Sequence, residues 1–235
     1  MSMALGSNLK SEMNSYLLHI ETATKVCSVA ISKNGELISI KESSEDAYIH
    51  SESLTLFIQD ALSTAGIQLA DLAAISISSG PGSYTGLRIG LSTAKGLCFA
   101  LNIPLISIET LDALRNLIEE PESNIIPLLD ARRMEVYAKV YRNDGKILAE
   151  LDAVVVNENS FSDFEPFIVL GDGAAKCKEM WRTRNIVWHD HIQSSARGQA
   201  SIAYGKYTRK EFENLAYFVP IYLKEANGVK RSSAE

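Results

Sequence analysis

The sequence has few of the residues that form disulfides or bind metals. Its 235 residues include three cysteines, four histidines and two tryptophans. Three is an odd number, and the cysteines show no metal-ligand spacing. Cys27 and Cys98 fall in an apolar strand pattern and an apolar helix pattern, so we expect both to be small core residues. This usage excludes a disulfide framework and is typical of a reducing compartment, so we expect a cytoplasmic protein.

Long hydrophobic runs and an excess of positive charge are also absent. No apolar run approaches the roughly 18 residues of a membrane-spanning helix, so we expect no membrane association. Residues 1–14 lack the apolar centre of a signal peptide, and residues 1–15 read as a flexible extension. The 23 Lys and Arg and 29 Asp and Glu residues give a net charge of −6. Binding of nucleic acid by bulk charge is therefore not expected, and any contact would need a local basic patch or a basic partner.

Hydrophobic periodicity in the first half predicts alternating strands and helices. Asn34-Gly35 is a strong signal for a hairpin between two of the strands. The expected strands cover 17–21, 26–32, 36–41, 72–78 and 105–108, and the expected helices cover 51–65 and 86–101. This order is that of a ribonuclease-H-like unit, in which a three-stranded meander is extended by parallel strands with crossover helices.

The second half repeats this order more loosely and predicts a duplicated α/β architecture. We expect an N-terminal lobe over 16–109, a C-terminal lobe over 110–223 and a tail over 224–235. The expected strands cover 124–130, 136–141, 146–150 and 167–170, the expected helices cover 111–119, 171–181 and 201–215, and 218–223 closes the fold.

A glycine-rich stretch, Ser79–Gly90, joins a predicted strand to a predicted helix. Gly80 and Gly82 allow backbone angles closed to other residues, and Ser83 or Thr85 can cap the helix. A turn of this kind before a helix can also bind an anion. The stretch lacks the lysine of a phosphate-binding P-loop, so the pattern favours a tight structural turn over a phosphate site.

Nucleotide binding at the first turn has weak support. Glu21 lies at the end of the first predicted strand, and its side chain is one methylene longer than that of an aspartate, which would displace a magnesium ion. The hydroxyl groups of Thr22 and Thr24 could bind a phosphate or equally tie down a hairpin turn. Gly171 and Gly173 lie at a plausible second-lobe position, and such glycines are more often part of a simple turn.

The sequence predicts no metal site and no catalytic residue. His50 has no histidine partner at position 54, and His189 and His191 are too close in sequence to share a helix face. His19, on an apolar strand, is expected to be a core residue. The G-x-S-x-G pattern of a serine nucleophile is absent.

Several short motifs occur one after another along the chain. They are Ile20–Thr24, Cys27–Ala30, His50–Glu52, Gly80–Gly90 with Ala94–Leu97, and Asp130–Tyr137. In this combination the sequence resembles the TsaB (YeaZ-like) family of bacterial tRNA threonylcarbamoyladenosine biosynthesis proteins over about residues 16–145. The segment Pro220–Leu223 resembles the ending of that family.

The resemblance implies an actin/hsp70/sugar-kinase-like fold of two ribonuclease-H-like lobes. It also implies a non-catalytic scaffold subunit of a complex that adds threonylcarbamoyl to the adenosine next to the anticodon, in tRNAs that read codons starting with A. The implied partners are the catalytic paralogue TsaD and the ATPase TsaE, with tRNA bound indirectly through the complex. No cofactor is expected in the chain itself, and a nucleotide at the interface of the complex is left open.

The two long helices offer a candidate docking surface. Apolar residues recur at helical spacing on both, and Gly90, Thr93 and Gly96 would let a second helix approach closely. With the resemblance, this predicts half of a four-helix bundle with the paralogue, or with a second copy when the chain is alone. The candidate residues are Leu54, Ile58, Ala61, Leu62, Leu87, Gly90, Thr93, Ala94, Leu97 and Leu101.

Two questions remain open at the level of sequence, the role of one loop and the function of the whole chain. The stretch Asp130–Glu135 joins two strands, and Arg132 and Arg133 could grip a phosphate or carboxylate, or pair with Asp130 and Glu135 and only fix the loop. The pattern slightly favours the latter. For the whole chain, the alternatives to a scaffold are a stand-alone ATP-binding enzyme and a metallopeptidase of the same fold.

Overall fold

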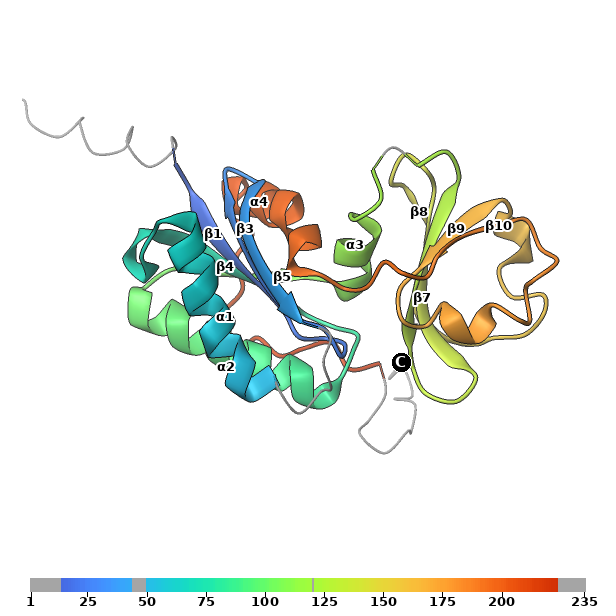
Figure 1. Ribbon diagram of the computed structural model, residues 1–235, viewed down its shortest axis with the longest axis horizontal. Helices are drawn as coiled ribbons and strands as arrows, with labels where there is room; N and C mark the ends of the chain where they lie inside the picture. The colour runs from blue at the N-terminus through green and yellow to red at the C-terminus, as the bar shows by residue number, and fades with distance from the viewer. Residues whose placement is uncertain (1–13, 44–49, 120, 224–235) are drawn as a thin grey trace, which may run out of the picture.

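The protein has two lobes, each built around a five-stranded sheet (Figure 1). The computed structural model describes residues 14–43, 50–119 and 121–223. Most of the expected extension over 1–15 and the whole expected tail over 224–235 lie outside these residues. Within the described part of the chain, no helix has the length and apolar character needed to cross a membrane.

The first sheet combines an antiparallel meander with two parallel strands. Its order is β3-β2-β1-β4-β5, in which β1 pairs antiparallel with β2 and parallel with β4. Two helices, α1 and α2, make the crossovers. The elements are β1 (Tyr16–Glu21), β2 (Cys27–Lys33), β3 (Glu36–Ser43), α1 (His50–Ala65), the short 3-10 turn η1 (Leu69–Asp71), β4 (Leu72–Ser78), α2 (Tyr84–Leu101) and β5 (Leu105–Ile108).

Both faces of the first sheet are buried. Leu18 and Ile20 of β1 face a core shared with α1 and α2. Leu17, one residue out of phase, packs on the opposite face with Ala74 and Ala203. Since side chains alternate along a strand, a sheet covered on both faces has a nearly continuous apolar sequence, which is the pattern of β1.

The second sheet has the same order as the first when it is read from β8 to β10. Its order is β8-β7-β6-β9-β10, with β6 antiparallel to β7 and parallel to β9. Its elements are β6 (Asn124–Asp130), β7 (Glu135–Tyr141), β8 (Ile147–Val155), η2 (Ser162–Phe164), β9 (Phe167–Leu170), η3 (Ala175–Cys177) and β10 (Ile186–His189). The duplicated topology confirms the prediction of two ribonuclease-H-like lobes.

The second lobe differs from the prediction after Leu170. The expected helix over 171–181 is only the single turn η3, and the parallel strand β10 was not expected. Trp181 is fully buried here, with its ring 6.0 Å from Phe161 and 6.2 Å from Phe167, and its indole N–H donates to the Asn157 carbonyl at 2.8 Å. This segment is held by the burial of one large aromatic side chain and not by the apolar face of a helix. Such burial does not require apolar residues at helical spacing.

The connection between the lobes is a short helix, α3 (Thr110–Arg115), which ends before the predicted Glu119. Lys139 of β7 is buried and bonds both Glu109 and Asp112 at 2.9 Å. Burial and the positive charge of Lys139 act in opposite directions on Glu109, with burial the larger effect, so the pKa of Glu109 is raised. A buried pair of this kind fixes the second sheet to the start of α3.

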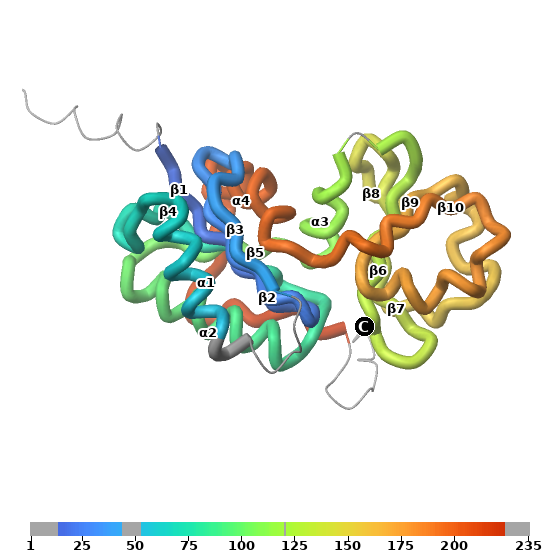
Figure 2. The backbone as a smooth tube through the Cα atoms, in the orientation of Figure 1, coloured from blue at the N-terminus to red at the C-terminus, as the bar shows by residue number. Residues whose placement is uncertain are grey.

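The C-terminal segment returns to the first lobe, which corrects the expected lobe division at 109/110 (Figure 2). The turn η4 (Ala196–Gln199) and α4 (Ala200–Thr208) pack on the first sheet. The helix stops at Thr208 rather than at residue 215, and 218–223 forms no strand. Individual backbone hydrogen bonds hold this segment instead. The Glu213 N–H donates to the Leu105 carbonyl at 2.9 Å, and the Ile221 N–H donates to the Ser79 carbonyl at 2.7 Å. Without this segment, the face of the first sheet opposite α1 and α2 would be exposed. Burial of the apolar side chains on that face favours the packing of the segment on the first lobe.

Candidate functional site

The glycine-rich turn is pressed against the turn between β1 and β2. A Cβ atom on Gly82 would lie 2.3 Å from the Ala23 carbonyl oxygen, and one on Gly86 would lie 2.0 Å from the Thr22 carbonyl oxygen. The Ser83 N–H donates to Ala23 at 2.6 Å, and the Ser83 hydroxyl accepts from the Gly86 N–H. Glycine is needed here because backbone approaches backbone, and this accounts for the motif without a bound phosphate.

The two threonines expected at a nucleotide site are engaged in the same contact. The Thr22 hydroxyl donates to the Gly86 carbonyl at 2.8 Å, and the Thr24 hydroxyl accepts from the Val26 N–H at 3.2 Å. Both side chains are buried. Their hydroxyl groups therefore close the turns around them, which is the structural alternative that the sequence left open.

Gly171 and Gly173 are also occupied by packing. Gly171 has a φ of +94°, and a Cβ atom there would lie 2.3 Å from the Leu128 carbonyl oxygen. The N–H groups of Gly171 and Gly173 donate to Ile192 and Leu128, each at 3.0 Å. With these donors used, the turn after β9 has no free N–H at either glycine to hold a phosphate.

A chain of buried polar groups joins β1, β2 and β4, and Gln199 of η4 completes it. The His19 ring bonds Ser32 and Ser76, each at 2.7 Å, and Ser76 donates to the Gln199 carbonyl oxygen at 2.6 Å. The Gln199 amide donates to the Ile20 carbonyl at 2.9 Å and to the Ser78 hydroxyl at 3.1 Å. The sequence predicted a core role for His19 but missed Gln199, because a lone glutamine in an irregular segment carries no local signal.

The charge states in this network follow from burial. Burial lowers the pKa of His19 to about 3, so its ring is neutral. Since Ser76 donates to Gln199, it accepts from the His19 Nδ1–H, and Nε2 accepts from Ser32. Burial also raises the pKa of Glu21, which accepts hydrogen bonds from Ser78 and the Ala23 N–H. The side chains of this buried network therefore have hydrogen-bond partners within the protein.

Most of the residues expected to dock a partner are buried inside the first lobe. Leu54, Ile58, Ala61, Leu62, Leu87 and Ala94 have 6% exposure or less. Gly90 faces Thr22, where a Cβ atom would lie 2.3 Å from the hydroxyl oxygen. These seven residues are not available to a partner, which corrects the expectation, because the sheet of their own lobe already covers this side of the helices. Thr93, Leu97 and Leu101 are half-buried and reach the surface.

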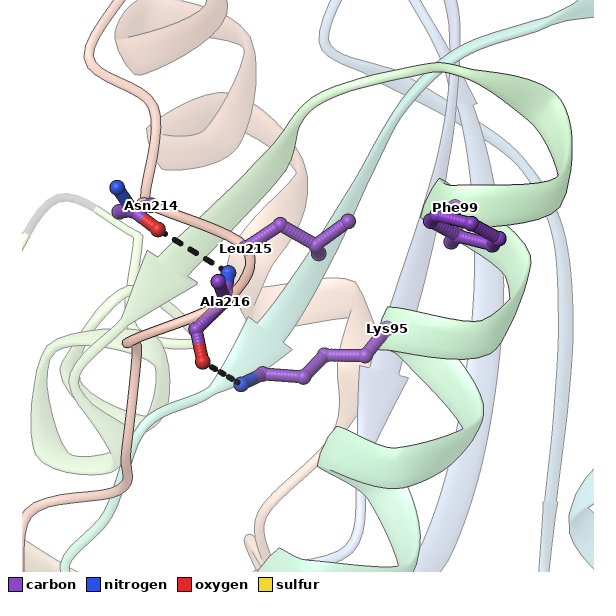
Figure 3. Close-up of a pocket in the computed structure, with 5 residues that line it drawn as sticks. All are labelled: Lys95, Phe99, Asn214, Leu215 and Ala216. Carbon is purple, nitrogen blue, oxygen red and sulfur yellow. Dashed lines mark hydrogen bonds between the residues drawn. The ribbon is translucent and has the colours of Figure 1, made fainter.

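Other residues form the outer side of the two helices. Leu56 of α1 is 58% exposed and Phe99 of α2 is 82% exposed. A Cβ atom on Gly96 would meet nothing within 4 Å. Near the end of α2, Lys95 and Phe99 border a groove of about 680 Å³ whose other wall is Asn214–Ala216 (Figure 3). Lys95 Nζ donates to the Ala216 carbonyl across this groove at 3.4 Å.

The histidines of the second lobe do not form a metal centre with acidic neighbours. The rings of His189 and His191 are 5.6 Å apart, and Asp190 pairs with Lys178 at 2.6 Å. Among residues 14–43, 50–119 and 121–223, no group of three or more His, Cys, Asp or Glu side chains is placed to hold a metal ion. Burial raises the pKa of the Cys27 and Cys177 thiols to about 11 and that of Cys98 to about 12, so none is a thiolate at neutral pH.

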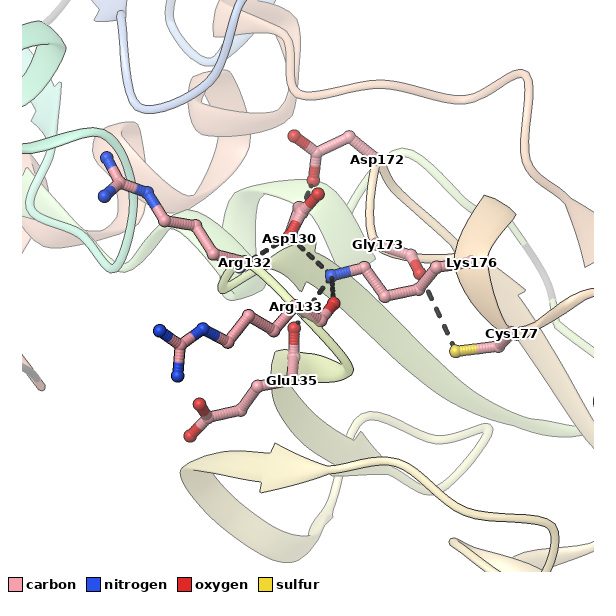
Figure 4. Close-up of polar contacts among 8 residues, drawn as sticks. All are labelled: Asp130, Arg132, Arg133, Glu135, Asp172, Gly173, Lys176 and Cys177. Atoms are coloured by element: carbon pink, nitrogen blue, oxygen red, sulfur yellow. Dashed lines mark hydrogen bonds and ion pairs between the residues drawn. The ribbon is translucent and has the colours of Figure 1, made fainter. Parts of the chain in front are cut away.

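Lys176 of η3 holds the loop between β6 and β7 in place (Figure 4). Lys176 Nζ contacts the Asp130 carboxylate at 2.5 Å and the carbonyl oxygens of Arg133 and Glu135 at 2.9 and 3.0 Å. Asp172 accepts from the Asp130 N–H at 2.9 Å, and its pKa is raised chiefly by burial. Asp130 thus pairs with Lys176 and not with an arginine, contrary to the interpretation that the sequence slightly favoured.

Comparisons with known proteins agree with this architecture. A family model described as "TsaD: tRNA N6-adenosine threonylcarbamoyltransferase" matches residues 44–225. The protein named "tRNA threonylcarbamoyladenosine biosynthesis protein TsaB" in Escherichia coli (strain K12) is 27% identical over 88% of this chain and 94% of its own length. Its namesake in Bacillus subtilis (strain 168) is 31% identical over 60% of this chain and 57% of its own length. The solved structure "YeaZ from Pseudomonas aeruginosa" has a TM-score of 0.78 at 26% identity and covers 89% of this chain and 100% of its own.

Two lobes of one strand order, with crossover helices on the first sheet, define a protein of the actin/hsp70/sugar-kinase-like class. Within this class, the family model matches most of the chain. The chain belongs to the TsaD family, and its curated relatives place it with the TsaB (YeaZ) proteins.

Proposed function

We propose that this chain is a non-catalytic scaffold subunit in tRNA threonylcarbamoyladenosine biosynthesis. It binds and supports the paralogue TsaD, which adds threonylcarbamoyl to the adenosine next to the anticodon in tRNAs that read codons starting with A. The observation that carries the proposal is the exposed apolar surface at Leu56 and Phe99 on the two crossover helices. A partner that packs on the outer side of these helices would cover both side chains.

The two turns considered for nucleotide binding support a non-catalytic role. The hydroxyl groups of Thr22 and Thr24 bond the protein itself, and so do the N–H groups of Gly171 and Gly173. An ATP site built from these four residues would require a turn in each lobe to open. We therefore expect the isolated chain to hold no cofactor, and a nucleotide to be recruited only at the interface with the paralogue.

The partners follow from the docking surface and from the family. Covering Phe99 removes apolar area from water, which favours association. We expect a complex with TsaD, joined by the ATPase TsaE, and a homodimer through the same helices when the chain is alone. In this scheme the complex acts in the cytoplasm and presents tRNA to the catalytic paralogue.

Reconstitution tests this function. Purified chain, TsaD, TsaE and the enzyme that makes threonylcarbamoyl-adenylate are incubated with an unmodified tRNA transcript, and threonylcarbamoyladenosine is measured by mass spectrometry. Modification should require both the chain and TsaD. Full modification without the chain, or modification by the chain without TsaD, contradicts the proposal. ATP turnover by the isolated chain would instead support a stand-alone enzyme, and peptide cleavage with a bound metal would support a metallopeptidase.

A further inference from the structure

Two consecutive arginines hold a left-handed backbone at the tip of the β6–β7 hairpin. Arg132 has a φ of +69° and Arg133 has a φ of +52°. The β2–β3 hairpin of the same chain places Asn34 and Gly35 in this conformation, with φ values of +52° and +87°. Asparagine and glycine suit such a pair of positions, whereas arginine has no intrinsic preference for it. The arginines are therefore not explained by the turn that they form.

The backbone of the loop is held by hydrogen bonds that do not involve either guanidinium group. The Arg132 N–H donates to Asp130 at 2.6 Å, and the Arg133 carbonyl accepts from Lys176 at 2.9 Å. Both arginine side chains are exposed. Within the part of the chain that the structure describes, no hydrogen bond or ion pair reaches either guanidinium group, and both extend from the loop in Figure 4.

A strained backbone held in place by its surroundings is found most often at functional sites. Here Lys176 pairs with Asp130, one of the two carboxylates beside the arginines, so that Asp130 is not paired with an arginine side chain. The positive charge of the tip is thereby kept available to a ligand. A guanidinium group has a planar fork of donors that matches the geometry of a phosphate.

We propose that Arg132 and Arg133 bind phosphate groups of an RNA backbone. This inference rests on the proposed function, since it assigns a direct RNA contact to a chain that otherwise only supports its paralogue. The net charge of −6 opposes RNA binding by bulk charge, so a direct contact by this chain needs a local positive group such as this tip. Both side chains are exposed in the part of the chain that the structure describes, which suits an extended polyanion better than a small nucleotide that buries most of its surface.

The test uses the complex of the chain with TsaD and an unmodified tRNA transcript, with the dissociation constant measured over a series of salt concentrations. The variant is Arg132→Asn with Arg133→Gly, which copies the Asn34-Gly35 turn and so relieves the backbone. Its thermal midpoint should be unchanged or higher. Its affinity for tRNA should fall by at least about tenfold, and the slope of log K against log salt should fall by about 2.

A charge-matched control is Arg182→Asn with Arg209→Asn. Both arginines are exposed and already paired, with Glu179 and Glu211, so tRNA affinity and salt slope should stay at the wild-type values. Equal affinity and slope for the Asn-Gly variant and the wild type overturn the inference. Competition by millimolar ATP that removes the difference between them also overturns it, because the phosphate would then be that of a nucleotide.

The two proposals fail in distinguishable ways. If the complex forms and modifies tRNA while the Asn-Gly variant binds tRNA normally, only the RNA contact is wrong. If no complex with TsaD forms and no modification occurs, the proposed function is wrong. The tRNA titration is then repeated with the isolated chain, where a loss of affinity in the variant still supports the contact and no difference overturns it.

Discussion

The side chains of Ser76 and Gln199 share a hydrogen bond of 2.6 Å, although 123 positions separate them in the chain. Ser76 lies on β4, next to the central strand of the first sheet, and Gln199 lies in η4, which follows the last strand of the second sheet. Through this bond the chain end completes the polar interior of the lobe in which it began. The first lobe is therefore not a unit that ends at its last strand.

Replacing Gln199 with leucine should destabilise the protein strongly. The Ile20 carbonyl and the hydroxyl groups of Ser76 and Ser78 would each lose a buried partner. We expect a loss of about 3 kcal/mol in the free energy of unfolding, measured by urea denaturation. Gln59→Leu, at an exposed position of α1, is the control and should change stability by no more than about 0.5 kcal/mol. Similar values for the two variants would contradict the importance of the network.

Two glycines of α2 should respond to alanine in opposite directions. A Cβ atom on Gly86 would lie 2.0 Å from the Thr22 carbonyl oxygen, whereas one on Gly96 would meet nothing within 4 Å. Gly86→Ala should destabilise by about 2–3 kcal/mol, because two backbone segments must separate. Gly96→Ala should stabilise by up to about 1 kcal/mol, the helix preference of alanine over glycine. Thermal unfolding of both variants checks the sign, and a tolerated Gly86→Ala would refute the close contact of the two turns.

Stability should fall in mild acid because of His19. The folded-state pKa is about 3 and the ordinary value is 6.5, so between these values the unfolded chain binds the additional proton. Stability is then present above pH 6.5 and is lost as the pH falls, by about 1.4 kcal/mol per pH unit. Glu21 has the opposite effect. Because its pKa is raised in the folded state, its contribution to the stability of the protein is lost as the pH rises above 4.5.

Urea unfolding at pH 7.5 and pH 5.0 isolates the contribution of the histidine. His19→Gln should lower stability at pH 7.5 but should lose about 2 kcal/mol less than the wild type on going to pH 5.0. His191→Gln, at an exposed position, should keep the acid sensitivity of the wild type. An unchanged pH dependence in His19→Gln would show that the buried imidazole is not the cause.

Thr93→Glu should prevent assembly and leave the monomer folded. Thr93 is half-buried on α2, where an added carboxylate can still reach water in the free chain. In a helix–helix interface the same charge would be buried without a partner, at a cost of several kcal/mol. We expect a loss of affinity for TsaD of at least about 100-fold, measured by calorimetry and size exclusion. Thr183→Glu in the second lobe is the control, and equal binding by the two variants would place the interface elsewhere.

Local patterns in the sequence were sufficient for most of the fold. Asn34-Gly35 marked the first hairpin, and apolar periodicity marked α1 and α2. The order of elements was enough to predict the repeated lobe. The pattern failed at β10 and at the segment over 171–181, where one buried tryptophan organises an irregular loop and no period exists to be read.

The docking residues were predicted less well, for a physical reason. An apolar stripe at helical spacing shows that one side of a helix is covered, but it does not say by what. The structure assigns Leu54, Leu62 and Ala94 to the core of their own lobe and leaves Leu56 and Phe99 outside. Exposure of single apolar residues carries no periodic signal, so only packing could identify them.

By itself, the sequence determined the class of fold, the duplicated strand order and the family, because these depend on local periodicity and on residues that are neighbours in the chain. The tertiary structure decided the return of α4 to the first lobe, the closure of the buried network by Gln199 and the availability of Arg132 and Arg133. Each of these depends on segments that meet only after folding. Spacing along the chain does not show which distant group, Lys176 or an arginine, pairs with Asp130.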